Sequence, residues 1–339
     1  MNTKIVPAQR ASAFPPRTTV EVARYVIGSA IWAPSVHNTQ PWWFAIDGAQ
    51  IELHADVRRL LCVADPAARE MLMSCGAALF TAKLALRTLG FVPECRVLPD
   101  PADPHLIACL RWRRQAPPVG YERLLADQVT RRRTHRGGFG PVPLLPGLLD
   151  VLRQGAARDG ADLRIASDDA SRALLAALVE MAERAQRIDS AYVSELAQWT
   201  PPPDSMRPDG VAPSSYPARP EHTSPHFPGR DFARGHGWGL PSGGPGTNNY
   251  AGVACVLTTP ADYPDNWVNA GHALQRILLT VAAYGAAAAL HSQPTEIGWL
   301  REAIRNQIGD GSYPQLVLRL GTVIQSEVSL RRPLNSVLR

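Results

Sequence analysis

Lysine is almost absent from the 339-residue sequence, where it occurs only at positions 4 and 83, so nearly all of the basic charge is arginine. Arginine presents a planar fork of donors that suits phosphate and carboxylate groups, whereas lysine is a flexible point charge. The 35 basic and 30 acidic residues give a formal net charge of +5. That excess is mild for this length, so it permits an anionic ligand but does not predict a partner nucleic acid.

Cysteine is also scarce: five residues stand at positions 62, 75, 95, 109 and 255, and no two form a C-x-x-C pair. An odd number of scattered cysteines in a long chain indicates free thiols in a reducing compartment. No apolar run reaches the roughly 18 residues of a membrane span. Residues 1–16 lack the apolar stretch of a secretory signal. We therefore expect a cytoplasmic protein with no membrane contact and no metal site.

The common nucleotide and hydrolase motifs are missing. Gly235, Gly237 and Gly239 lack the G-x-G-x-x-G spacing and follow no predicted strand. A phosphate-binding loop of the Walker type needs a Gly-Lys pair, and the sequence has none. A G-x-S-x-G elbow is absent as well. No motif in the sequence therefore supports Ser-His-Asp catalysis or nucleotide binding by one of these loops.

Hydrophobic periodicity predicts an α+β chain in two successive regions, residues 18–115 and 121–339. The first region is expected to contain, in order, a helix at 18–33, strands at 42–46 and 51–55, a long helix from 72 to 89 and a strand at 106–112. The second is expected to contain a helix from about 171 to 199, a strand at 253–258, a helix from about 268 to 284 and a strand at 315–320.

A short pattern repeats in the two regions. Gly76-x-Ala-Leu is followed by Gly90, and Gly271-x-Ala-Leu is followed by Gly285, so the spacing is 14 in both copies (90 − 76 and 285 − 271). Each copy spans one long apolar helix. The repeat predicts a duplicated domain whose two halves pack like a homodimer, with these two helices at the centre.

A Pro- and Gly-rich insert, residues 200–247, interrupts the second region. Its eleven prolines exclude a long helix or a central strand. A loop of this length is usually a functional lid or a disordered insert. Its aromatic residues favour an ordered lid, since a disordered linker would not need them; they are Tyr216, Phe227, Phe232 and Trp238.

Two polar segments carry candidate chemistry. The turn from Ala33 to Trp42 contains two prolines and short polar side chains that suit contacts to a planar heterocycle, although a capped turn beside a core tryptophan explains it as well.

In the run 131–136, Arg132, Thr134 and Arg136 would project to one side of an extended chain. Two guanidiniums around a hydroxyl make a phosphate clamp, which Arg331 and Arg332 could complete. The alternative is two solvated basic patches.

Together these segments resemble the FMN-dependent nitroreductase family. The family's Pro-Ser-x-x-Asn-x-Gln-Pro-Trp turn is matched by residues 34–42, and its Arg-x-Ser/Thr-x-Arg/Lys phosphate motif by residues 132–136. The order of further segments is similar to the Acg-type branch, which has two nitroreductase-like halves and a lid in one chain. Those segments are 65–79, 195–199, 291–296 and 314–321. The resemblance covers residues 18–339.

The resemblance implies an α+β pseudo-dimer of two nitroreductase-like halves, each a small mixed or antiparallel sheet packed with helices. It implies one FMN between the halves, because the turn occurs only in the first half and the clamp only in the second. Pro34, Ser35 and Asn38 would contact the ring or its polyol chain, and Ser292 and Gln293 would contact the ring. Arg132, Thr134, Arg136, Arg331 and Arg332 would hold the phosphate.

The implied activity is hydride transfer through the flavin, and no catalytic side chain is assigned. NAD(P)H is a candidate transient donor, and the substrate is a small molecule, with an aromatic one favoured if Trp32, Trp42, Trp43 or Trp238 lines the pocket rather than the core. Two alternatives stay open. One is an FMN-sequestering protein with little turnover, and the other is an enzyme specialised for one biosynthetic oxidation or for flavin breakdown. The chain could be a monomer with pseudo-dimeric halves or a homodimer.

Overall fold

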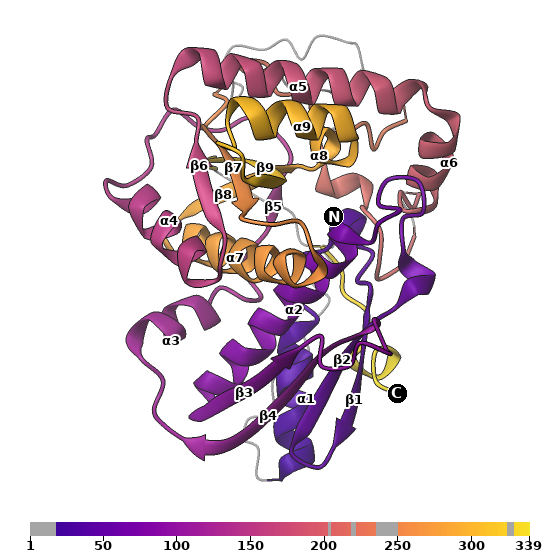
Figure 1. Ribbon diagram of the computed structural model, residues 1–339, viewed down its shortest axis with the longest axis vertical. Helices are drawn as coiled ribbons and strands as arrows, with labels where there is room; N and C mark the ends of the chain where they lie inside the picture. Colours follow the sequence, from indigo (N-terminus) through magenta and orange to yellow (C-terminus); the bar gives the residue numbers. More distant parts are fainter. Residues whose placement is uncertain (1–17, 203–204, 218–221, 235–249, 324–328) are drawn as a thin grey trace, which may run out of the picture.

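The protein is built around two β-sheets, one from each half of the chain, with two long helices between them (Figure 1). The computed structural model describes residues 18–202, 205–217, 222–234, 250–323 and 329–339. The architecture is the predicted α+β arrangement of two sheet-and-helix halves. No helix of the described ranges is long and apolar enough to cross a membrane.

The first half is a four-stranded antiparallel sheet with helices on one face. Its strands, in the spatial order β1-β2-β4-β3, are β1 (Trp42–Asp47), β2 (Gln50–Ala55), β3 (Phe91–Val97) and β4 (Leu106–Gln115). Helix α1 (Thr19–Ala30) begins at Thr18, whose side chain and that of Glu21 form the predicted capping box. Alternate strand residues such as Phe44 and Leu53 pack against α1 and α2 (Arg69–Thr88). The short helix α3 (Gly120–Ala126) follows this sheet.

The second half is a five-stranded mixed sheet with helices on both faces. Its spatial order is β5-β8-β9-β7-β6, and only the β5–β8 pair is parallel. The strands are β5 (Thr134–His135), β6 (Asp162–Ile165), β7 (Val253–Thr259), β8 (Ala286–His291) and β9 (Tyr313–Thr322). Cys255 and Leu257 of β7 face α4 and α7, whereas Ala254 and Val256 face α5 and α9. These helices are α4 (Leu148–Arg158), α5 (Asp169–Ile188), α7 (Pro264–Ala283) and α9 (Gly298–Gln307).

The two repeat glycines lie where α2 and α7 cross. A Cβ atom added to Gly76 would stand 2.2 Å from the carbonyl oxygen of Val268, and one added to Gly271 would stand 2.0 Å from that of Met73. Only a hydrogen at each position lets the two backbones approach this closely. The predicted central packing of the two long helices is therefore confirmed, and the repeat supplies its point of contact (Figure 1).

One predicted helix was wrong in its extent. The segment expected as a single helix from 171 to 199 is two helices, α5 and α6 (Ser190–Gln198). Asp189 separates them with an extended backbone, and its carboxylate accepts hydrogen bonds from the N–H groups of Ala191 and Tyr192. Aspartate is a favoured N-cap because it satisfies these free donors, so it starts a new helix here.

The chain's end returns to the first half. Phe44 of β1 donates its N–H to Val337 and accepts the N–H of Arg339. The short helices η4 (Leu334–Ser336) and η1 (Val36–Asn38) lie near this crossing, and Val337 is buried in the first core. Residues 329–339 therefore belong spatially with the first sheet, although the sequence prediction grouped them with the second half. The remaining short helices are η2 (Val57–Arg59), η3 (Pro213–Ser215) and α8 (Gln293–Glu296).

Candidate cofactor and substrate site

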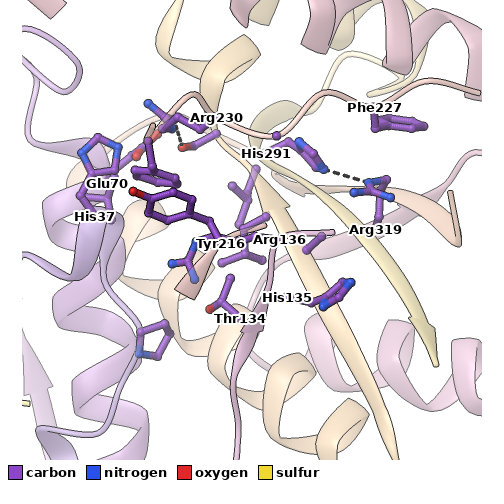
Figure 2. A pocket seen from close by; sticks show the side chains of 18 of the residues that line it. His37, Glu70, Thr134, His135, Arg136, Tyr216, Phe227, Arg230, His291 and Arg319 are labelled. Atoms are coloured by element: carbon purple, nitrogen blue, oxygen red, sulfur yellow. Dashed lines mark hydrogen bonds between the residues drawn. The ribbon is translucent and has the colours of Figure 1, made fainter. Parts of the chain in front are cut away.

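A cavity lies between the two halves and the insert, with about 1180 Å³ of empty space that includes its opening to solvent. Pro34 and Ser35 come to its wall from the first half, Thr134 and Arg136 come from the second, and Tyr216 comes from the insert. In Figure 2, His37 and Glu70 lie together on one side of the pocket, and Thr134 and His135 lie on the opposite side. The structure thus brings together segments that the sequence predicted to share one site.

The turn after α1 is held in an unusual backbone conformation. His37, Asn38 and Gln40 have φ angles of 46°, 55° and 49°, in the left-handed region that costs non-glycine residues energy. The Ser35 hydroxyl accepts the N–H of Gln40 at 2.9 Å, and the Gln40 amide donates to the carbonyl of Pro208 in the insert at 2.8 Å. The insert and the turn therefore stabilise each other.

Asn38 acts inside the protein rather than on the cavity wall. Its amide nitrogen donates to the carbonyls of Gly210 and Leu330 at 3.0 and 3.3 Å. Its Oδ1 accepts from Nη1 of Arg331 at 3.2 Å. Asn38 thereby links the turn, the insert and the C-terminal tail, and it positions the Arg331 guanidinium.

Arg132, Arg136 and Arg331 form a cationic cluster in which the Arg132 side chain is buried and the other two are partly buried. Burial, and after it the neighbouring guanidiniums, lowers the pKa of Arg132 and Arg136 to about 10 and that of Arg331 to about 9. Arg132 and Arg331 each have an Nε with no hydrogen-bond partner within the described ranges. Nη1 of Arg132 lies 3.3 Å from the Thr134 hydroxyl. None of the three has an ion-pair partner among the residues that the structure describes, and such a group of cations is a candidate site for an anion.

Arg332, the other half of the C-terminal pair, lies outside this cluster. Its guanidinium donates to the carbonyl oxygens of Gln40, Trp42 and Ser336 at 3.1, 3.2 and 2.7 Å. These bonds anchor the C-terminal tail to the start of β1. Arg332 therefore has a structural role in this fold. Arg331 is the member of the pair that lies with Arg132 and Arg136.

Ser292 and Gln293 have different surroundings. Ser292 lines the cavity, donates to Glu296 at 2.7 Å and accepts from Arg230 at 2.8 Å. Gln293 is buried beneath the cavity, and its amide donates to Glu183 at 3.3 Å. Ser292 is thus available at the wall, whereas Gln293 supports the segment behind it.

An ion pair that the sequence did not predict fastens the insert to the second half. Arg230 and Glu296 are 2.6 Å apart, and their side chains are almost fully buried. Their separation of 66 residues gives no local pattern in the sequence. The pair joins residues 222–234 to α8, so the described part of the insert is ordered against the cavity.

His37 is a second unforeseen wall residue. It is 6% exposed, and neither ring nitrogen has a hydrogen-bond partner within the described part of the chain. Burial, and then the charges of Arg230 and Arg136, lower the pKa of His37 well below its usual value, so the ring is neutral. The sequence offered one sign of this position, because His37 stands between Ser35 and Asn38 in the predicted turn. The turn motif, however, assigns no role to the two residues between its serine and its asparagine.

Among the described residues, the aromatic rings on the cavity wall come from the insert. Tyr216, Phe227 and Phe232 line the cavity, and the rings of Tyr216 and Phe232 stack with centroids 5.6 Å apart. Trp42 is fully buried in the first core, and Trp43 stacks on His54. Trp238 lies outside the described residues. The lid aromatics were therefore the better sequence signal for the pocket.

Sequence comparison identifies the relatives of this chain. A Mycobacterium tuberculosis H37Rv protein, named provisionally as NAD(P)H nitroreductase Rv3131, is 34% identical over 319 residues, which are 93% of this chain and 88% of the relative. The chain belongs to the nitroreductase superfamily, in its Acg-type branch. The M. tuberculosis H37Rv protein named provisionally as NAD(P)H nitroreductase Acg is 28% identical over 323 residues, 94% of this chain and 96% of the relative. No protein-family model matches this nitroreductase-like chain.

Solved nitroreductase structures show weaker likeness. A provisionally named nitroreductase from Anabaena variabilis matches 96% of this chain and 93% of its own, with 11% identity and a TM-score of 0.49. A nitroreductase with bound FMN from Desulfitobacterium hafniense matches 63% of this chain and 96% of its own, with 15% identity and a TM-score of 0.37. The family assignment rests on the sequence identity and not on these scores.

Proposed function

We propose that this protein is an FMN-dependent oxidoreductase of the nitroreductase type, with one FMN bound between its two halves. The cluster of Arg132, Arg136 and Arg331 is the observation that carries the proposal. An FMN phosphate bears close to two negative charges and offers several acceptor oxygens, which can accept hydrogen bonds from the three guanidiniums and the Thr134 hydroxyl.

The remainder of the cavity suits the flavin ring. Pro34 and Ser35 stand on its wall near the strained turn, and the aromatic rings of the insert supply apolar surface for a planar ligand. Bound there, the flavin would supply two-electron hydride chemistry, and the protein would bind and orient it. Asn38 contributes by holding Arg331 in place rather than by touching the ring.

The relatives' names support NAD(P)H as the electron donor of this proposed enzyme. The substrate is a small molecule that enters beside the aromatic residues of the insert. An aromatic compound fits such a wall by stacking.

FMN sequestration with little turnover is a second candidate function. The observation that favours it is the insert, whose Tyr216 and Phe232 line the cavity and whose Arg230 is locked to Glu296 by a buried ion pair. An insert held this firmly would restrict the approach of a bulky donor.

The spectrum of the purified protein tests both candidates. We expect flavin absorbance, and we expect FMN after extraction of the denatured protein. Anaerobic NADPH then separates the two functions, since bleaching of the flavin supports the reductase and an unchanged spectrum supports sequestration. A colourless protein that does not take up added FMN would contradict both.

A further inference from the structure

Glu70, at the start of α2, is a buried carboxyl on the cavity wall. Four charged groups act on it, namely the carboxyls of Asp65 and Glu296 and the guanidiniums of Arg69 and Arg230. If all five groups were ionised, three negative charges would face two positive ones, and Arg230 also acts on the buried carboxyl of Glu183. An uncompensated buried charge is costly, and a carboxyl in that position keeps its proton instead.

The hydrogen bonds indicate which carboxyl holds the proton. Asp65 accepts two backbone N–H groups of the first turn of α2, at 2.8 and 3.1 Å, and these donors favour its ionised form. Glu296 accepts from both terminal nitrogens of Arg230 and from the Ser292 hydroxyl. Burial raises the pKa of Asp65 to about 6, which still leaves it ionised at pH 7. Asp65 and Glu296 are therefore both supplied with donors as carboxylates.

Glu70 has fewer donors. One oxygen, Oε1, accepts from Nη2 of Arg69 at 2.9 Å. Arg69 also donates to Gln315 and to Thr295, so its charge is shared. Burial, and next the charge of Glu296, raises the pKa of Glu70 well above its usual value, although Arg69 opposes the shift.

A separate observation indicates that this wall binds a ligand. His37 is nine-tenths buried and lines the same cavity as Glu70 (Figure 2). Both of its ring nitrogens lack a hydrogen-bond partner among the residues that the structure describes. Unsatisfied buried polar atoms of this kind are rare in proteins unless a ligand or water meets them.

We propose that Glu70 is a neutral carboxylic acid at pH 7 and that its second oxygen, Oε2, donates a hydrogen bond to an acceptor atom of the compound bound in the cavity. Glu70 thereby selects small-molecule substrates that present an uncharged acceptor oxygen at this wall, while the arginine cluster holds the phosphate of the FMN beside them. The proposal rests on the proposed function for the compound bound, but the protonation of Glu70 does not.

Infrared spectroscopy of the flavin-free protein tests the protonation alone. At pH 8 we expect the C=O stretch of a protonated carboxyl in the wild type and its loss in Glu70→Gln. The band of Glu70 is read from the wild-type minus Glu70→Gln difference spectrum, because Glu183, a second buried carboxyl whose pKa burial raises, is present in both proteins. Glu122→Gln removes a carboxylate that pairs with Arg87 away from the cavity and should leave the band unchanged. Identical wild-type and Glu70→Gln spectra would overturn the proposal, whether or not the protein binds FMN.

Calorimetric titration of the FMN-loaded protein tests the hydrogen bond. The probes are 4-nitrobenzyl alcohol, which has acceptor oxygens, and 4-methylbenzyl alcohol, which lacks them on the ring. Glu70→Leu should weaken binding of the nitro probe about five- to tenfold, as expected for the loss of one hydrogen bond. Binding of the methyl probe should change little. Glu70→Gln keeps a neutral donor, so it should bind the nitro probe nearly as well as the wild type. Equal losses for both probes would overturn the proposal.

The pH dependence provides a second check that does not need Glu70→Leu to fold. Wild-type affinity for the nitro probe should fall as the pH rises through the pKa of Glu70, because the ionised carboxylate has no proton to donate. Affinity in Glu70→Gln should stay constant over the same range. A wild-type affinity that is flat up to pH 10, with an infrared band absent at pH 8, contradicts the neutral acid.

Discussion

At the scale of single residues, the site depends on titratable side chains that burial shifts toward their uncharged forms. Among the described residues, Arg132, Arg136 and Arg331 have no ion-pair partner, and burial lowers their pKa. Burial also raises the pKa of Glu70 and lowers that of His37. Arg136, Glu70 and His37 line the cavity, and Arg132 and Arg331 lie beside Arg136.

The arginine cluster should discriminate FMN from riboflavin. One charge-assisted hydrogen bond is worth about 1.5–3 kcal/mol, so Arg136→Ala should weaken FMN binding about tenfold or more. Riboflavin lacks the phosphate, so its binding should weaken much less. Fluorescence titration of both ligands measures the difference, and Arg113→Ala, at an exposed arginine of β4, is the control. Equal losses for the two ligands would place Arg136 outside the phosphate site.

A buried histidine between α2 and α7 should make the protein sensitive to acid. Burial, and then Lys83 and Arg276, lowers the pKa of His272 to about 3, while an unfolded histidine keeps a pKa near 6.5. Below pH 6.5 the unfolded chain therefore binds the proton more readily, and stability falls as the pH falls.

His272→Leu should remove that part of the pH dependence. Between pH 7.5 and 4.5 the variant should lose about 3 kcal/mol less free energy of unfolding than the wild type. Urea unfolding at both pH values measures it. His105→Gln, at an exposed loop position, should behave as the wild type does. The same pH slope in His272→Leu and wild type would show that His272 is not held neutral.

What sequence could reveal about the site depended on distance along the chain. Arg132, Thr134 and Arg136 form a local pattern with a chemical meaning, so the sequence could predict that they lie together. Their role as a phosphate clamp stays a prediction. Glu70, Arg230 and Glu296 meet only through the tertiary fold, and no local pattern relates them. Asn38 was predicted at the site, but its hydrogen bonds to the insert and tail could not be foreseen from the turn itself.

At the scale of elements, the crossing of α2 and α7 determines how the halves meet. Gly271→Ala should destabilise the protein by at least about 1–3 kcal/mol, because its Cβ would meet the Met73 carbonyl and force the helices apart. Gly28→Ala is the matched control, since Gly28 is helical and has no atom within 4 Å of an added Cβ. That control should be stabilised by about 0.5–1 kcal/mol. Urea denaturation measures both, and equal effects would contradict the close crossing.

The insert should control access to the cavity. Tyr216→Ala combined with Phe232→Ala removes two stacked rings from the wall, so reduction of bound flavin by a small donor such as dithionite should become faster. Stopped-flow absorbance measures the rate. Tyr263→Ala removes a tyrosine that is 67% exposed and does not line the cavity. If the double variant is reduced no faster than this control, the insert is not the barrier.

Helices and strands could be predicted from the sequence where their apolar residues recur at regular spacing. The long amphipathic helices and the strands at 42–46 and 253–258 were predicted because apolar residues recur at regular spacing. Strand β8 was missed because its four alanines, Ala286–Ala289, carry little strand preference. It becomes a strand because it fits between β5 and β9. Tertiary pairing, rather than local preference, forms that element.

At the scale of the whole molecule, the two halves are unequal partners. The first contributes the strained turn and Glu70, the second contributes Arg132, Thr134 and Arg136, and the tail returns Arg331 to the first half. The described residues contain one set of these segments, so under the proposed function we expect one FMN site per chain.

Calorimetric titration of flavin-free protein with FMN tests this account most directly. It predicts one FMN per 339-residue chain, with FMN bound at least about tenfold more tightly than riboflavin because of the phosphate contacts. Two FMN per chain would contradict a single site between unequal halves. Equal affinity for FMN and riboflavin would contradict the role of the arginine cluster.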